Sequence, residues 1–149
     1  MLETNPIDCP YYLISRVTLF VTSTLKRGFT NAGLTAVKPA YLGVLLTLWC
    51  EDGLKVIDLG RKSGLEPSTM TGLLDRMERD ELLYREADPS DRRAQRIYLT
   101  TTGREVKMPV LRVVDKVLAG VFKGIAEKEL HNTKDILQRV LANAQEGNR

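Results

Sequence analysis

Cysteine, histidine and long apolar runs are scarce in this chain of 149 residues. Two cysteines are too few for a disulfide framework, and the lone His131 gives no Cys/His cluster with the spacing of a zinc site. No apolar run reaches the ~18–20 residues of a membrane span, and no signal peptide is visible. We therefore expect a cytoplasmic protein with no metal site, no cofactor and no membrane partner, and we expect His131 to lie on the surface.

The chain also lacks the residue patterns of an enzyme. It has no nucleophile–base pair and no glycine-rich loop that could cradle a phosphate. With 43% hydrophobic and 28% charged residues it is ordinary material for one globular domain. The net charge of +3 is only mildly basic, so any attraction to nucleic acid must come from local clusters.

The most informative pattern predicts an amphipathic helix over Pro67–Asp80. Its apolar residues recur at helical spacing and suit packing on a small core: Met70, Leu73, Leu74 and Met77. The opposite face carries Ser68, Thr69, Thr71, Gly72 and Arg76. Short hydroxyl side chains let a backbone approach base edges or phosphates, and the helix dipole favours anions at this end. Capping of the first helical turn is the alternative use of these hydroxyl groups.

A shorter helix is predicted just before this one. Val56, Ile57 and Leu59 lead to Lys62-Ser63-Gly64, where the glycine suits a left-handed C-cap. Two short helices joined by a glycine-containing turn fit a helix-turn-helix, although structural helical hairpins share the pattern.

A two-stranded ribbon is predicted next. The strands Leu82–Arg85 and Arg96–Leu99 flank the turn residues Asp88–Asp91. Four arginines lie on this ribbon: Arg85, Arg92, Arg93 and Arg96. An arginine at a hairpin tip suits the narrow, negative minor groove of DNA, and Asp91 is placed to hold Arg93 in a defined pose. The alternative is a solvated loop with local ion pairs.

These residues resemble the MarR family of winged-helix transcription regulators, and the resemblance covers nearly the whole chain. Its most specific part is an Asp-x-Arg motif, here Asp91 and Arg93, followed by Leu99-Thr100 and Gly103. The other matching residues are Gly33-Leu34-Thr35, Leu59, Gly64-Leu65, Ser68–Thr71, Leu73–Arg76 and Asp88–Arg93.

The resemblance implies a mainly α fold with a small β-wing. Residues 1–149 would form a single domain, with a winged helix-turn-helix lobe over 36–100 and dimerisation helices over 10–33 and 104–145. It also implies an obligate homodimer on double-stranded DNA, with the helix Pro67–Asp80 in the major groove and Arg93 in the minor groove. The DNA-binding residues would be Ser68, Thr69, Thr71, Gly72, Arg76, Asp91, Arg92 and Arg93.

Two positions depart from the family pattern. Family members often carry a long polar residue where this chain has Gly72, so one base contact is expected to be absent or made by backbone. They usually have glycine where this chain has Glu81. Because glutamate tolerates a left-handed backbone poorly, we expect the turn after the helix to be built differently.

The outer segments predict the dimer. Their apolar stripes exceed what one small domain can bury, so a partner subunit is expected to cover them. A coiled coil alone is the alternative for the C-terminal stretch. Thr102–Glu105 fits a capping box, and Pro109 should kink the following helix or fall in its first turns. The stripes are Leu13, Val17, Phe20, Val21 and Leu25; Val110, Val113, Val114, Val117, Leu118, Val121 and Phe122; and Ile136, Leu137, Val140 and Leu141.

Two release signals are open. Cys9 precedes Pro10 and lies in a position similar to the reactive cysteine of the organic-hydroperoxide-sensing branch of the family; an inert N-terminal cysteine is the leading interpretation, and redox sensing is the alternative. Family members also bind small aromatic ligands next to the dimer helices. Tyr12, Arg16 and Tyr41 could line such a site, although aromatic residues at helical spacing are more often core, and Trp49 is expected to be core packing.

The leading hypothesis is therefore a homodimeric, sequence-specific DNA-binding regulator, a repressor released from a palindromic operator by a small ligand or an oxidant. The alternative is a winged helix used for protein–protein contact without DNA readout. Gly72, Glu81 and the nearby acidic residues Asp75, Glu78, Asp80 and Glu86 keep that alternative open.

Overall fold

The computed structural model describes residues 5–147, so residues 1–4 and 148–149 of the predicted domain lie outside it. Internal contacts divide the chain into two compact units, one that ends at Val117 and one that begins at Leu118. The assignment of residues 1–149 to a single domain stays a prediction.

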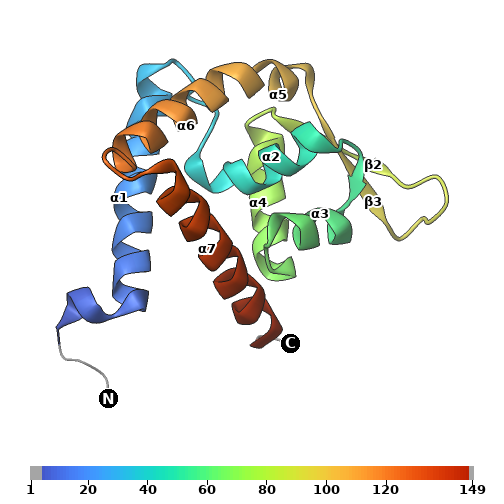
Figure 1. Cartoon of the computed structure of the whole chain (residues 1–149). Helices are drawn as coiled ribbons and strands as arrows, with labels where there is room; N and C mark the ends of the chain where they lie inside the picture. Colours follow the sequence, from blue (N-terminus) through green and yellow to red (C-terminus); the bar gives the residue numbers. More distant parts are fainter. Residues whose placement is uncertain (1–4, 148–149) are drawn as a thin grey trace. The chain divides into compact units, whose positions relative to one another are not determined.

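Helices dominate the described residues and accompany one small antiparallel sheet (Figure 1), which confirms the expected fold class. No helix within residues 5–147 is long and apolar enough to cross a membrane. In chain order the elements are the 3-10 helix η1 (Pro6–Asp8), α1 (Pro10–Asn31), the 3-10 helix η2 (Pro39–Tyr41), α2 (Leu42–Cys50), β1 (Leu54–Lys55), α3 (Val56–Ser63), α4 (Pro67–Arg79), β2 (Leu83–Ala87), β3 (Gln95–Leu99), α5 (Thr101–Glu105), α6 (Lys107–Val121) and α7 (Glu127–Gly147).

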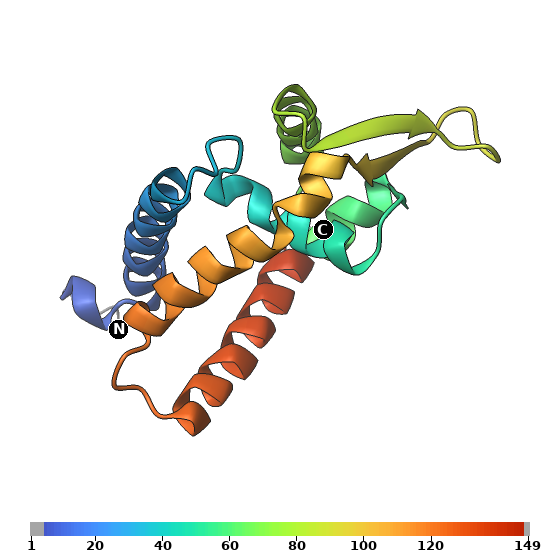
Figure 2. The same ribbon diagram turned by 90° about the horizontal axis from the view of Figure 1, so that it is seen from above.

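The predicted ribbon is the hairpin of β2 and β3, which extends away from the helices around it (Figure 2). Leu83 lies opposite Leu99, and Arg85 lies opposite Ile97. Because side chains alternate along a strand, Leu83 and Arg85 lie on the same face of the sheet. The strand β1, which the sequence patterns do not predict, pairs with β3 and completes the sheet order β1-β3-β2.

One side of α4 is buried as its apolar spacing predicts. Met70, Leu73, Leu74 and Met77 expose at most 2% of their surface. Burial of one aliphatic side chain contributes roughly 1.5–3 kcal/mol, so this stripe fixes which side of α4 can face a partner. The same core contains residues from α2, α3 and the sheet: Leu45, Leu48, Leu59, Ile97 and Leu99.

The turn between α3 and α4 is the one that Gly64 predicts. Gly64 has a φ of 68° in the left-handed region, and the N–H of Leu65 donates to the Gly60 carbonyl at 2.9 Å. A left-handed glycine that ends a helix in this way allows α4 to begin within three residues. The predicted helix-turn-helix is therefore present.

The turn after α4 corrects an expectation. Glu81 adopts a left-handed φ of 60°, so the prediction of a differently built turn is wrong. The N–H of Glu81 donates to the Glu78 carbonyl and the N–H of Leu82 donates to the Met77 carbonyl, both at 3.0 Å, which are the two bonds of a Schellman motif. The Thr100 hydroxyl also donates to the Glu81 carbonyl at 2.6 Å. These bonds hold Glu81 in a backbone conformation that costs a non-glycine residue roughly 1–2 kcal/mol.

The start of α5 also differs from its prediction. Thr100, and not Thr102, is the N-cap, because its hydroxyl accepts from the N–H of Gly103 at 2.9 Å. A Cβ atom on Gly103 would lie 2.0 Å from the Leu82 carbonyl oxygen, so the backbone approach at this position requires glycine. The helix breaks at Val106 and resumes, with Pro109 in the first turn of α6, as predicted.

The helices α1 and α7 each leave large apolar side chains exposed. On α1, Val17 and Phe20 expose 54% and 68% of their surface, and on α7, Leu137 and Leu141 expose 46% and 55%. Exposed apolar surface of this kind is typical of interaction sites. The dimerisation role of residues 10–33 and 104–145 stays a prediction.

Replacement of Glu81 by glycine should stabilise the protein. Since glycine adopts a positive φ without steric cost, Glu81→Gly should raise the free energy of unfolding by about 1 kcal/mol, measured by urea denaturation at one fixed protein concentration. Gly64→Ala is the matched control, because it introduces a side chain at the left-handed turn between α3 and α4. It should lower the free energy of unfolding by a similar amount. A Glu81→Gly variant less stable than the parent would contradict the account of this turn.

Candidate nucleic-acid interface

The side of α4 opposite the core is polar and accessible. The predicted residues Ser68, Thr69, Thr71 and Arg76 are all exposed. The hydroxyl groups of Ser68 and Thr69 make no hydrogen bond to any residue in the described part of the chain, and the N-cap Glu66 makes no side-chain cap. The hydroxyls are therefore not used for capping, which removes the main structural explanation for them. Only Thr71 bonds within the helix, to the Pro67 carbonyl at 3.4 Å.

Gly72 leaves room that Arg76 occupies. A Cβ atom on Gly72 would have one neighbour within 4 Å, the guanidinium Nη1 of Arg76 at 3.6 Å. The arginine therefore lies back over the glycine one turn earlier on the exposed face. The head of Arg76 thus lies next to Gly72, where the sequence analysis expects a base contact to be absent or made by backbone.

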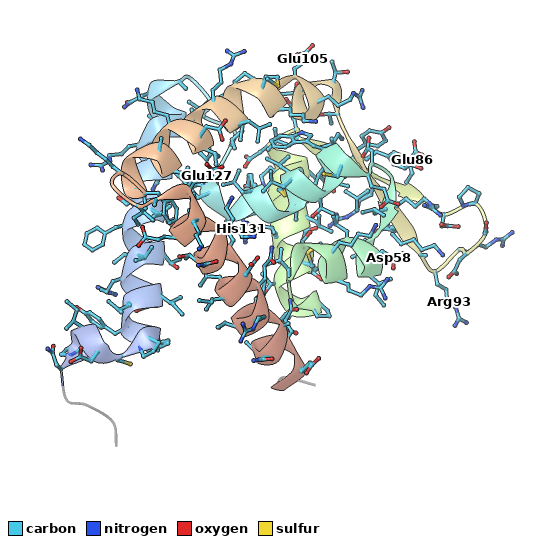
Figure 3. The ribbon with its side chains drawn as sticks, viewed as in Figure 1. Asp58, Glu86, Arg93, Glu105, Glu127 and His131 are labelled. Atoms are coloured by element: carbon cyan, nitrogen blue, oxygen red, sulfur yellow. The ribbon has the colours of Figure 1, made fainter. Side chains whose placement is uncertain are left out.

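The tip of the hairpin carries two arginines that form no ion pair within residues 5–147. Arg92 and Arg93 are exposed, and Figure 3 shows Arg93 projecting outward from the tip. Asp91 is exposed too, but its carboxylate accepts from the backbone N–H of Arg93 at 3.0 Å rather than from the guanidinium. Asp91 thus shapes the backbone of the tip, and the expected hold on the arginine head is not formed.

The other two arginines of the ribbon are engaged inside the lobe. Arg85 donates through Nη2 to Asp75 at 2.7 Å and through Nη1 to Glu78 at 2.8 Å, so one guanidinium joins β2 to two successive turns of α4. Arg96 donates to Asp88 at 2.7 Å and to the Gly53 carbonyl at 2.8 Å. The four arginines therefore separate into two that build the wing and two that are available to a partner.

Asp88 anchors the base of the tip, a role that the sequence interpretation missed. It is only 4% exposed, and its carboxylate accepts from the N–H groups of Ser90 and Asp91 as well as from Arg96. The bond from Ser90, followed by that from Arg96, holds the pKa of Asp88 below its ordinary value of 3.8 against the effect of burial. An aspartate whose carboxylate accepts from the N–H two residues later forms an Asx turn. The Asp88-Pro89-Ser90 sequence is the signal that could have identified this role.

The acidic residues near this surface are mostly neutralised. Asp75 and Glu78 pair with Arg85, and Asp80 pairs with Lys38 at 3.2 Å. Exposed ion pairs contribute little to stability, but they cancel the negative charges that would repel a phosphate backbone. The unpaired negative charge near this surface is therefore smaller than the count of acidic residues in the sequence indicates.

The residues proposed for sensing do not form one site. Cys9 is half-buried at the N-cap of α1, and Arg16 lies over the ring of Tyr12 at 5.8 Å. Tyr41 is fully buried and its hydroxyl donates to Asp80, so it offers no surface to a ligand. Trp49 packs as expected, with its indole N–H donating to the Gly103 carbonyl at 2.9 Å.

His131 is exposed on α7 (Figure 3), as predicted. Its Nε2 lies 3.5 Å from a carboxylate oxygen of Asp135.

Comparisons with known proteins agree with the fold. The sequence model of the MarR family matches residues 39–94. The chain is 32% identical over 95 residues to the HTH-type transcriptional regulator YsmB of Bacillus subtilis (strain 168), a match that covers 64% of this chain and 65% of that protein. It is 44% identical over 69 residues to the HTH-type transcriptional regulator TtmR of Methylorubrum extorquens (strain PA1), covering 46% of this chain and 35% of that protein. These matches thus span less than two thirds of either relative.

Among solved structures, the transcriptional regulator PcaV of Streptomyces coelicolor in complex with its natural ligand has a TM-score of 0.80 and 26% identity. That likeness covers 97% of this chain and 99% of PcaV.

The anchor at Asp88 predicts an acid-sensitive wing. A carboxyl group whose pKa is lower in the folded state stabilises the fold above its unfolded pKa, and this contribution is lost as the pH falls through the folded pKa. Asp88→Asn should therefore be less stable than the parent at pH 7, and the gap should close below about pH 4. Thermal unfolding across this range measures it, with Asp58→Asn, at an exposed ion pair with Arg61, as a control that changes little. An unchanged stability at pH 7, or a gap that persists in acid, would contradict this role.

Proposed function

Because the chain belongs to the MarR family of winged helix-turn-helix transcription regulators, we propose that it represses transcription as a homodimer bound to a palindromic site on duplex DNA. In this proposal α4 enters the major groove and the hairpin tip enters the adjacent minor groove. Release follows the binding of a small ligand or the action of an oxidant.

The observation that carries the proposal is that two of the four hairpin arginines bond to carboxylates of the lobe and the other two do not. Arg92 and Arg93 are exposed at a projecting tip without a carboxylate partner among the described residues, whereas Arg85 and Arg96 are both engaged. An arginine at such a tip is attracted by the negative potential of a narrow minor groove. The bonds from Asp88 to the tip backbone hold the loop that presents these arginines.

The exposed side of α4 complements the tip. The N–H groups of Ser68 and Thr69 precede the first helical hydrogen bond, which Met70 donates to Glu66 at 3.0 Å. Together with the two hydroxyls they offer donors to phosphate or base edges, and Arg76 adds a guanidinium about two turns further on. The assignment of Ser68, Thr69, Thr71, Gly72, Arg76, Asp91, Arg92 and Arg93 to the DNA contact is part of this proposal.

The exposed apolar residues of α1 and α7 support the dimer. A monomer would leave the side chains of Val17, Phe20, Leu137 and Leu141 in water. A second copy that covered these residues would also set two α4 helices at a fixed spacing, which reading a palindrome requires.

Tyr12 and Arg16 are the remaining candidates for contact with a small ligand. Arg16 stacks on Tyr12, and 42% of the tyrosine surface is exposed. An arginine over an aromatic ring suits an aromatic or anionic compound. The solved PcaV structure contains that protein's natural ligand, which supports release by a small molecule within this fold. Cys9 is retained as the site for an oxidant.

Arg93→Ala should weaken binding to a duplex recovered from a random-sequence pool by roughly 1–3 kcal/mol, because the minor-groove contact is lost. Fluorescence anisotropy over a range of salt concentrations measures the affinity. The matched control is Lys26→Ala, which also removes one positive charge. Lys26 lies on α1, which Figure 1 shows on the opposite side of the unit that ends at Val117 from the hairpin, so this variant should change the affinity little.

Equal affinities for the parent and Arg93→Ala would argue against minor-groove insertion. The salt dependence separates the two functional classes, because a DNA-binding protein that neutralises phosphates loses affinity steeply as salt rises. Indifference of the parent protein to duplex DNA at every salt concentration would instead favour the protein–protein interaction module.

A further inference from the structure

A hydrogen-bonded cluster around the buried Tyr41 joins the C-terminal end of α4 to the segment that follows α1. The hydroxyl of Tyr41 donates to Oδ2 of Asp80 at 2.5 Å, and Nζ of Lys38 donates to the same oxygen at 3.2 Å. Lys38 also reaches the Tyr41 hydroxyl at 3.4 Å and lies over the tyrosine ring at 5.5 Å. We call Lys38, Tyr41 and Asp80 the Tyr41 cluster.

The end of α4 is unfavourable without this cluster. Asp80 caps the helix C-terminus, where the helix dipole disfavours a negative charge, and Glu81 follows in a left-handed conformation. The hydrogen bond from Tyr41, together with Lys38, keeps the pKa of Asp80 below its ordinary value, so the carboxylate is charged at neutral pH. Burial raises the pKa of Tyr41, so its hydroxyl remains a donor. Each partner thus stays in the protonation state that the bond requires.

The cluster lies at a junction between helices. Tyr41 ends η2, and η2 contacts α1, α2 and α4. The side chain of Tyr41 has no exposed surface, so it cannot move without a change in the packing around it. Tyr41 thus links η2, which contacts α1, to the end of α4 through one buried side chain and a short hydrogen bond.

We propose that Tyr41 and Lys38 are positioning residues that couple α1 to α4 through Asp80 and thereby set the pose of α4 for reading DNA. The reading of DNA rests on the proposed function, whereas the coupling itself is a property of the protein alone. The sequence analysis treats Tyr41 as a ligand contact and Asp80 as one of the acidic residues near the predicted DNA-binding helix, and neither describes this role.

The coupling can be tested in the free protein. A Cβ atom on Gly28 of α1 would lie 2.7 Å from Cγ1 of Val113, so Gly28→Ala forces α1 to shift or a stiff β-branched side chain to change rotamer. Met70 and Met77 lie buried on α4, so their methyl resonances, after isotope labelling, report on that helix. Gly28→Ala should displace both resonances, and in a Tyr41→Phe background the displacement should fall by more than half.

Tyr84→Phe is the matched control background. Tyr84 stacks on Tyr98 at 5.6 Å, and its hydroxyl makes no hydrogen bond to a residue in the described range. In that background Gly28→Ala should displace the two resonances as far as in the parent. Equal displacements in the parent and in Tyr41→Phe would overturn the coupling. If Gly28→Ala does not fold, the duplex affinities of Tyr41→Phe and Asp80→Ala test the coupling instead.

The consequence for DNA is measured with a labelled duplex recovered from a random-sequence pool. Tyr41→Phe and Asp80→Ala should each lower the affinity about three- to tenfold, and the double variant should be no weaker than either single variant. A purely structural role would lower the unfolding midpoint of Tyr41→Phe but leave the affinity of the folded protein unchanged, and that result would overturn the proposal. A parent protein that binds no duplex would overturn the proposed function, while the methyl resonances would still decide the coupling.

Discussion

Burial of one side of α4 is the constraint on which the rest of the structure depends. The four apolar residues of its stripe are among the least exposed in the chain, so the helix can neither rotate nor slide without exposing them. Because that side is buried, the residues on the opposite side of α4 are exposed to solvent. Burial of Leu73 and Leu74 on one side of the helix therefore exposes the hydroxyl groups of Ser68 and Thr69 and the guanidinium of Arg76 on the other side.

Electrostatic pairing then determines which charged groups reach a partner. Arg85 and Arg96 bond to carboxylates of the lobe and hold the hairpin to α4 and to the base of the wing. Their positive charges compensate the negative charges of Asp75, Glu78 and Asp88. Arg92 and Arg93 are exposed and pair with no carboxylate of residues 5–147, and Figure 3 shows Arg93 projecting outward. A mildly basic chain thus concentrates positive charge at one place without a large net charge.

The features that could be predicted from the sequence are those with a local cause. The stripe from Met70 to Met77, the left-handed Gly64 and the turn before Arg93 each follow from spacing or residue type over a few positions. Features with distant partners were missed. Glu81 adopts a conformation that its residue type disfavours because the Schellman bonds and Thr100 hold it there. The buried Asp88 depends on Arg96, and the role of Tyr41 depends on Asp80, 39 residues further along the chain.

The central claim is that two copies of this chain place two α4 helices and two hairpin tips on one duplex. Selection of bound duplexes from a random-sequence pool by the purified protein, followed by sequencing, tests it most directly. The account predicts an enriched palindrome whose half-sites lie about one helical turn apart, roughly 10–10.5 base pairs from centre to centre, or a multiple of that distance. Enrichment of an asymmetric site without a repeated half-site, or no enrichment at all, would contradict it.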